Sequence, residues 1–189
     1  MSASALRLAS TSQRGNDWLA RNPNAKKRPP DYWRKFSFKL GEGFQFLCGY
    51  MTLWTTDGTV DHFVSIDEDR SRAYDWDNYR YVAGWVNSSK QHVVSTEILD
   101  PYEVEEGWFE ILLPTLELVV TSKVPPEKRA RAEQTLKSLP IGRDERAIKR
   151  RGVYYDGYLK KEFDLALLRK QAPLLAAAIE KQLAARPTP

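Results

Sequence analysis

Cysteine is almost absent from this sequence: Cys48 is the only one among 189 residues. An intramolecular disulfide is therefore excluded, and so is a zinc site built from pairs of cysteines, because structural zinc takes four nitrogen or sulfur ligands. No stretch approaches the roughly 20 apolar residues of a membrane span, and the N-terminus lacks the apolar run of a secretory signal. We therefore expect a cytoplasmic protein with no membrane partner.

The excess of positive charge is small. Lysine and arginine contribute 29 charges and aspartate and glutamate 25, which leaves a net charge of +4. Such a balance is compatible with a phosphate-rich partner, but also with an ordinary solvated surface. Apolar residues make up 42 % of the chain, which is enough for a hydrophobic core. The length fits one compact domain with appended elements.

The order of apolar and turn-forming residues predicts an α+β fold in three parts. Residues 1–30 end in K-K-R-P-P and are expected to form a basic arm or linker, with a short helix over 11–19. Residues 31–100 would form the core, and residues 101–189 would add a β-hairpin and a mostly helical extension packed on that core. The basic segment fits either a solvated linker or a phosphate-contacting arm, and the linker is the commoner of the two.

Local signals place several elements within these parts. Asp57-Gly58 predicts a hairpin turn between two strands in 52–64, and the segment 76–89 predicts a helix capped by Asp75 or Asp77. The segment 31–47 fits a helix or an extended chain equally well. The expected C-terminal elements are strands at 107–111 and 116–121, a helix over 125–139, and helical structure over 143–185 interrupted near Gly152, Gly157 and Pro173.

The most informative stretch lies between Cys48 and Lys90. Asp61 and His62 are adjacent there, and Asn87 lies near the end of the next helical segment. Carboxylate and amide oxygens suit a hard divalent cation such as Mg²⁺ or Mn²⁺, and a neighbouring imidazole can accept a proton from water near neutral pH. These residues alone also fit a histidine that is only hydrogen-bonded within the structure.

The wider pattern F-L-C-G-Y-M, G-T-V-D-H-F and Y-D-W-D-N-Y-R-Y-V-A-G-W-V-N-S-S-K resembles the HNH endonuclease family. The resemblance implies a ββα-metal core and metal-dependent hydrolysis of phosphodiester bonds, in DNA more than in RNA. It makes Asp61 and Asn87 ligands of Mg²⁺ or Mn²⁺ and His62 the general base. Asn78 would hold the motif together by hydrogen bonds, and Lys90 would be the lysine that closes it.

The sequence departs from this family at its zinc-binding cysteines, whose positions correspond to Cys48, Met51, Ala83 and Val86. One thiol cannot hold a structural zinc, so we expect a hydrophobic cluster there and no structural zinc. The C-terminal half is similar to that of small bacterial HNH proteins in anti-phage systems of the Septu or retron type. That similarity suggests an ATPase protein as a partner.

Three functions stay open at this point. In the first, a nuclease, the cations that contact phosphate would be Lys90, Arg72 and Arg80, although a solvated role is simpler for each arginine. The second is a catalytically inactive HNH-fold module that binds nucleic acid or a partner protein.

The third is a platform on which single-stranded bases stack. Aromatic residues within apolar runs more often serve core packing, which favours the first two functions. The tryptophans that could form such a platform are Trp33, Trp54, Trp76, Trp85 and Trp108.

Overall fold

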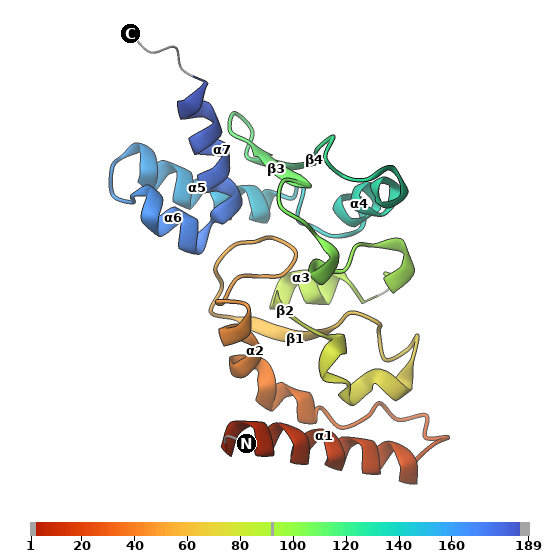
Figure 1. The fold of residues 1–189 in the computed structure, drawn as a ribbon. Helices are drawn as coiled ribbons and strands as arrows, with labels where there is room; N and C mark the ends of the chain where they lie inside the picture. The colour runs from red at the N-terminus through yellow and green to blue at the C-terminus, as the bar shows by residue number, and fades with distance from the viewer. Residues whose placement is uncertain (1–2, 92, 186–189) are drawn as a thin grey trace.

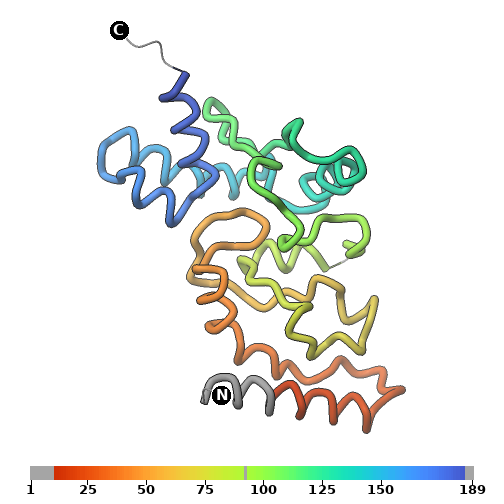
Figure 2. Tube along the Cα trace, in the orientation of Figure 1, coloured from red at the N-terminus to blue at the C-terminus, as the bar shows by residue number. Residues whose placement is uncertain are grey.

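The chain folds into a mixed α+β structure with two small, separate antiparallel sheets (Figure 1). The computed structural model describes residues 3–91 and 93–185. The chain runs from α1 at one end of the molecule to α7 at the other (Figure 2). The α+β class expected from the sequence is therefore confirmed.

The first sheet pairs β1 (Gly58–His62) with β2 (Tyr79–Ala83), and α3 (Gly84–Ser89) follows β2 directly. This register places Asp61 opposite Arg80 and His62 opposite Tyr79. The helix α3 packs on both strands. The C-terminal end of β1 therefore lies beside α3, although many residues separate them in sequence.

Two predictions for this region are wrong. Asp57-Gly58 does not join the strands of a hairpin, because β1 pairs with β2, and Trp54 makes only an isolated bridge to Leu47. Gly58 is the first residue of β1. A larger residue would collide there with the Tyr81 ring, which fills the space that a Cβ atom would need.

The segment 76–89 is likewise not one helix. It is a 3₁₀ turn (Trp76–Asn78), then β2, then α3. All five residues of β2 are buried, so their sequence lacks the alternation that marks a half-exposed strand. Asp75 caps this 3₁₀ turn and not a helix over 76–89: its carboxylate accepts a hydrogen bond from the Asp77 amide.

The N-terminal part forms a longer helix than predicted, α1 (Ala3–Arg21), which packs against two 3₁₀ turns. These turns are η1 (Tyr32–Phe36) and η2 (Arg70–Tyr74). The segment whose type was left open is helical, since η1 continues into α2 (Ser37–Gly43). The chain between α1 and η1 is hydrogen-bonded to η2 through the Lys27 and Pro30 carbonyls.

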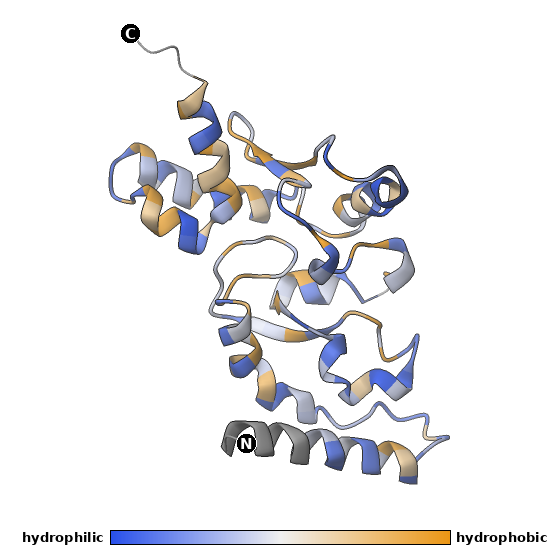
Figure 3. Ribbon diagram, viewed as in Figure 1, coloured by the Kyte–Doolittle hydropathy of each residue, from blue (hydrophilic) through white to orange (hydrophobic). Residues whose placement is uncertain are grey.

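The C-terminal part contains the predicted hairpin, β3 (Phe109–Leu112) and β4 (Glu117–Val120), and the predicted helix α4 (Pro126–Ser138). Three helices follow: α5 (Glu145–Leu159), α6 (Leu165–Gln171) and α7 (Pro173–Ala184). Hydrophobic and hydrophilic residues mix along these helices, as burial of one face requires (Figure 3).

Helix α5 corrects one expectation, because it continues through Gly152 and Gly157 without a break. Gly157 is needed for packing, because the Phe163 ring occupies the position of its missing Cβ. The interruption at Pro173 is present, since α6 and α7 meet there.

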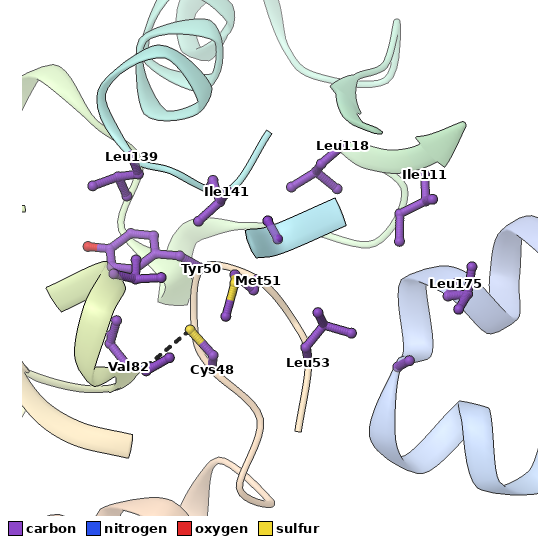
Figure 4. Packing of buried hydrophobic residues seen from close by; sticks show 14 of the residues in the cluster. Cys48, Tyr50, Met51, Leu53, Val82, Ile111, Leu118, Leu139, Ile141 and Leu175 are labelled. Carbon is purple, nitrogen blue, oxygen red and sulfur yellow. Dashed lines mark hydrogen bonds between the residues drawn. The ribbon is translucent and has the colours of Figure 1, made fainter. Parts of the chain in front are cut away.

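A shared hydrophobic core joins the N-terminal and C-terminal halves. It contains residues of the 48–53 segment, β2 and α3, together with residues of β3, β4 and α5 to α7 (Figure 4). The positions that correspond to the family's zinc ligands all lie in this core and are almost fully buried: Cys48, Met51, Ala83 and Val86. The Ala83 amide donates to the Cys48 sulfur at 3.4 Å. The expected hydrophobic cluster is therefore present.

Within the described ranges, no helix combines the length and apolar character needed to cross a membrane.

Candidate active site

A cavity of about 230 Å³ lies where the C-terminal end of β1 meets α3 and the segment that follows α1. Its walls include Asp61, His62 and Asn87, together with Lys90 and Arg28. The structure thus brings together both predicted metal ligands and the predicted base. Three other predicted site residues do not line it: Asn78, Arg72 and Arg80.

Asp61 is 3 % exposed, and its two carboxylate oxygens differ in their hydrogen bonding. Oδ1 accepts a hydrogen bond from the Lys90 ammonium at 3.1 Å, whereas Oδ2 is buried and has no hydrogen-bond partner among the described residues. Burial raises the pKa of Asp61 above its ordinary value, and the Lys90 charge opposes that rise. Burying a carboxylate oxygen without a partner is energetically costly, so Oδ2 is the polar atom of this site whose burial lacks compensation.

His62 is held by its main-chain and aromatic neighbours. Nε2 lies 2.9 Å from the Ala73 carbonyl oxygen; a carbonyl can only accept, so Nε2 carries the proton and Nδ1 keeps its lone pair. The rings of Trp33 and Tyr79 pack edge-on against the imidazole, at centroid distances of 4.7 and 5.1 Å.

The ionisation of His62 follows from this packing. Burial lowers its pKa from the ordinary value of 6.5 to about 4, and the Ala73 carbonyl opposes that change. The nearby charges of Arg28 and Lys90 lower the pKa further. The imidazole is therefore neutral at neutral pH, with a fixed orientation and a free acceptor nitrogen.

Asn87 faces β1 from α3. Its Nδ2 donates to the Thr59 hydroxyl at 2.9 Å and to the Val60 carbonyl at 3.3 Å. Both amide hydrogens are thereby used, which leaves Oδ1 as an acceptor for another partner. Asp61 and Asn87 both line the cavity, and carboxylate and amide oxygens are the kinds of ligand that a hard cation prefers.

The Lys90 ammonium makes its hydrogen bonds to other groups of the protein. Its side chain is 4 % exposed, and the ammonium donates to Asp61 Oδ1, to the His62 carbonyl at 2.7 Å and to the Phe63 carbonyl at 3.0 Å. An ammonium has three donors, so none remains for a phosphate. The geometry therefore argues against the predicted phosphate contact and makes Lys90 the residue that ties α3 to the end of β1.

Arg80 is likewise engaged within the protein. Its guanidinium forms a two-pronged, buried ion pair with Asp100 and donates to the Asp77 and Tyr79 carbonyls. It also lies 3.8 Å from the centroid of the Tyr102 ring. These contacts leave Arg80 buried and argue against the phosphate contact that was predicted for it.

The third predicted phosphate contact, Arg72, is half-exposed. Its guanidinium pairs with Asp75 through two nitrogens, at 3.1 and 3.0 Å. It lies outside the cavity that contains Asp61 and His62. Arg72 therefore stabilises the loop between the strands.

Asn78 holds the loop between β1 and β2 from its base. Its Oδ1 accepts from the Val64 amide at 2.8 Å, and its Nδ2 donates to the Val64 carbonyl at 2.9 Å and the Arg72 carbonyl at 3.2 Å. Because the same loop presents the Ala73 carbonyl to His62, Asn78 fixes the support of the imidazole. The Asn78 side chain does not line the cavity.

Several residues that shape the site were missed from the sequence. The Ala73 carbonyl and the Thr59 hydroxyl orient His62 and Asn87, and neither carries a local signal that marks it. Asp67 lies exposed on the cavity wall. Arg28 was noticed only as part of a basic run; the following two prolines were the signal that its position could be fixed.

The five tryptophans do not form one surface. Trp33 and Trp108 are buried, and Trp85 packs against the shared core. This arrangement favours core packing for these three residues, as their apolar sequence surroundings indicate.

Comparisons of the chain with protein-family models, with curated proteins and with solved structures find no match. Within the part of the chain that the structure describes, no group of three or more His, Cys, Asp or Glu side chains is placed to hold a metal ion. The candidate cation ligands here are one carboxylate and one amide, so water or substrate oxygens would have to complete the coordination sphere.

Proposed function

We propose that this protein is a divalent-metal-dependent endonuclease of the HNH type, which hydrolyses phosphodiester bonds in nucleic acid, with DNA as the favoured substrate. The observation that carries this proposal is the pairing of two features in one cavity. In residues 3–91 and 93–185, one buried carboxylate oxygen of Asp61 has no partner, and the adjacent His62 is neutral, with Nε2 bonded and no hydrogen bond to Nδ1.

The order of elements supports an HNH-like core. Two antiparallel strands are followed directly by a helix, and the proposed residues lie at the end of β1 and within α3. Asn78 closes the loop between the strands, where the family motif has its middle asparagine. The four residues that match zinc ligands lie in one cluster, as a lost zinc site would leave them.

The metal fits the donor atoms present. Asp61 Oδ2 and Asn87 Oδ1 would hold Mg²⁺ or Mn²⁺, since both are hard oxygen ligands. When bound, such an ion would stabilise the negative charge on the phosphate and on the leaving oxygen.

His62 would act as the general base. Its Nδ1 takes a proton from the water whose oxygen attacks phosphorus, the phosphorus–oxygen bond to the leaving group breaks, and solvent protonates the leaving oxygen. The Ala73 carbonyl holds the Nε2 proton throughout, so the imidazolium that forms keeps a hydrogen-bond acceptor. A neutral resting state makes the base available at neutral pH.

One observation favours a second candidate, a catalytically inactive HNH-fold module that binds nucleic acid or a partner protein. The Lys90 ammonium already faces one oxygen of Asp61 and partly neutralises it. A protein that has lost its metal could use this pair as a purely structural contact. An ATPase partner stays a prediction under either function.

Metal-dependent cleavage separates these two candidates. We expect the protein to nick or cut plasmid DNA with Mg²⁺ or Mn²⁺ and not with EDTA, and Asp61→Asn to remove both the activity and the metal-induced rise in Tm. Asp77→Asn is the matched control, because Asp77 is exposed and lies outside the cavity. A well-folded wild-type protein that neither binds these metals nor cuts DNA would support the inactive module.

A further inference from the structure

A second, larger cavity of about 870 Å³ adjoins the candidate active site. Arg28 and Asn87 line both cavities, so the two cavities share part of their walls. One wall of the larger cavity is the segment between α1 and η1, and it presents Lys27, Arg28 and Arg34. Asp31 also lines it, but its carboxylate is paired with Arg34 at 3.2 Å.

A phosphate bound in the candidate active site needs a positively charged side chain whose donors are not already used within the protein. Lys90 and Arg80 cannot supply one, because their donors are bound to Asp61, Asp100 and main-chain carbonyls. Arg28 differs from both: it is exposed, and among the described residues its guanidinium has no ion pair and no hydrogen bond. Its charge is close enough to affect His62.

The main chain around Arg28 is fastened to the loop that supports His62. The Arg70 guanidinium donates to the Lys27 carbonyl at 2.8 Å, and the Tyr74 hydroxyl donates to the Pro30 carbonyl at 2.7 Å. Both donors belong to η2, which also contains Ala73, the residue whose carbonyl holds His62.

The two prolines after Arg28 restrict the chain further, since each fixes its own φ angle. Pro29 is also buried. A solvated linker would not have these attachments. The main chain at Arg28 is therefore held beside the loop that supports His62.

We infer that Arg28 binds the scissile phosphate of the nucleic-acid substrate and that Lys27 binds a phosphate of the neighbouring nucleotide in the larger cavity. This inference rests on the proposed function for the identity of the substrate. A guanidinium can donate two parallel hydrogen bonds to phosphate oxygens, which positions the phosphorus as well as attracting it. Lys27 lines only the larger cavity, so it would contribute to affinity alone.

The test compares Arg28→Ala, Arg28→Lys and Lys27→Ala with Lys26→Ala, an exposed control that lines neither cavity. Cleavage of a labelled DNA duplex is measured with Mn²⁺ under single-turnover conditions at saturating protein. Binding of the same duplex is measured in EDTA over a range of salt concentrations by fluorescence anisotropy.

We expect Arg28→Ala to lower the single-turnover rate by about tenfold to a hundredfold, since a positioned phosphate donor is lost. It should also reduce the salt slope of binding by about 1. Arg28→Lys should recover part of the rate, because it keeps the charge without the two-pronged geometry. Lys27→Ala should reduce the salt slope but leave the saturated rate unchanged, and Lys26→Ala should change neither.

An Arg28→Ala protein that cleaves at the wild-type rate when saturated would overturn the inference while the proposed function stands. If wild-type protein binds the duplex but does not cleave it whichever divalent metal is added, the proposed function fails. The binding measurement then still tests whether Arg28 contacts phosphate. Unchanged affinity and salt slope in Arg28→Ala would then overturn the inference. Far-UV circular dichroism confirms folding of each variant.

Discussion

Acidification should destabilise this protein through His62. Burial lowers the pKa of the folded-state imidazole from 6.5 to about 4, whereas the unfolded chain keeps the ordinary value. Below pH 6.5 the unfolded state therefore binds a proton that the folded state does not. Stability is lost as the pH falls from about 6.5 towards 4, and it does not fall further through this residue once both states are protonated.

The size of this effect follows from the two pKa values. The full difference between 6.5 and about 4 corresponds to about 3 kcal/mol of unfolding free energy. At about pH 5 the unfolded imidazole is almost fully protonated and the folded one almost fully neutral, so about 2 kcal/mol is already lost. Since His62 is 8 % exposed, solvent screening reduces this figure little.

The assay has two parts, both in EDTA so that no cation binds beside the imidazole. The chain has two histidines, so a His92→Gln variant leaves one imidazole, whose pKa is read by NMR titration. Urea unfolding of wild type and His62→Gln at pH 7 and about pH 5 then isolates the contribution of this residue, because other titrating groups cancel in the comparison. A His62 pKa near 6.5, or equal pH dependence in both proteins, would refute the reasoning.

Three further changes test the support of the site. Asn78→Ala removes three hydrogen bonds from a buried amide and should cost about 3 kcal/mol by urea unfolding; a loss under about 1 kcal/mol would contradict its role in the loop. Lys90→Met leaves the Asp61 carboxylate buried without a counter-charge and should cost about 3–5 kcal/mol at neutral pH. That cost should shrink in acid, because a protonated carboxyl group needs no counter-charge; a cost independent of pH would contradict the pairing. Gly58→Ala places a methyl group where the Tyr81 ring lies and should lower stability by about 2 kcal/mol or more. Its control is Gly43→Ala, which has open space around it and should change stability by about 1 kcal/mol at most. Equal effects of the two substitutions would contradict the packing of Gly58 against the ring.

Three residues of the cavity were chosen from the sequence through a resemblance, because their residue types and spacing alone also fit a purely structural histidine. Asp61, His62 and Asn87 match a known motif, and the fold brings them to one cavity. The same resemblance pointed to Asn78, whose side chain forms hydrogen bonds with Val64 in the loop between β1 and β2.

The roles of the lysine and arginine side chains could not be predicted, because they depend on hydrogen-bond and ion-pair partners that are distant in sequence. Arg80 is buried by its pairing with Asp100, and the Lys90 ammonium is occupied by carbonyl groups that every residue type possesses. Only the folded chain shows which donors remain free. For the same reason Arg28 became a candidate only after its neighbours were known.

The prediction of β1 and β2 failed for a different physical reason. The Asp57-Gly58 pair is a strong local turn signal, but the pairing of β1 with the fully buried β2 outweighs it. A strand buried on both faces shows no alternation of polar and apolar residues, so its sequence also fits a helix. Tertiary packing decided between these two structures.

The central claim is that His62 takes a proton from the attacking water. The most direct measurement is the single-turnover rate of DNA cleavage with Mn²⁺ by wild-type protein and by His62→Ala, with the same Tm assay and circular dichroism applied to both. We predict a fall of about a hundredfold or more in His62→Ala, since general-base catalysis contributes at least that much. A folded His62→Ala protein that cleaves within about twofold of the wild-type rate would contradict the account, since the loss of a general base should far exceed that margin.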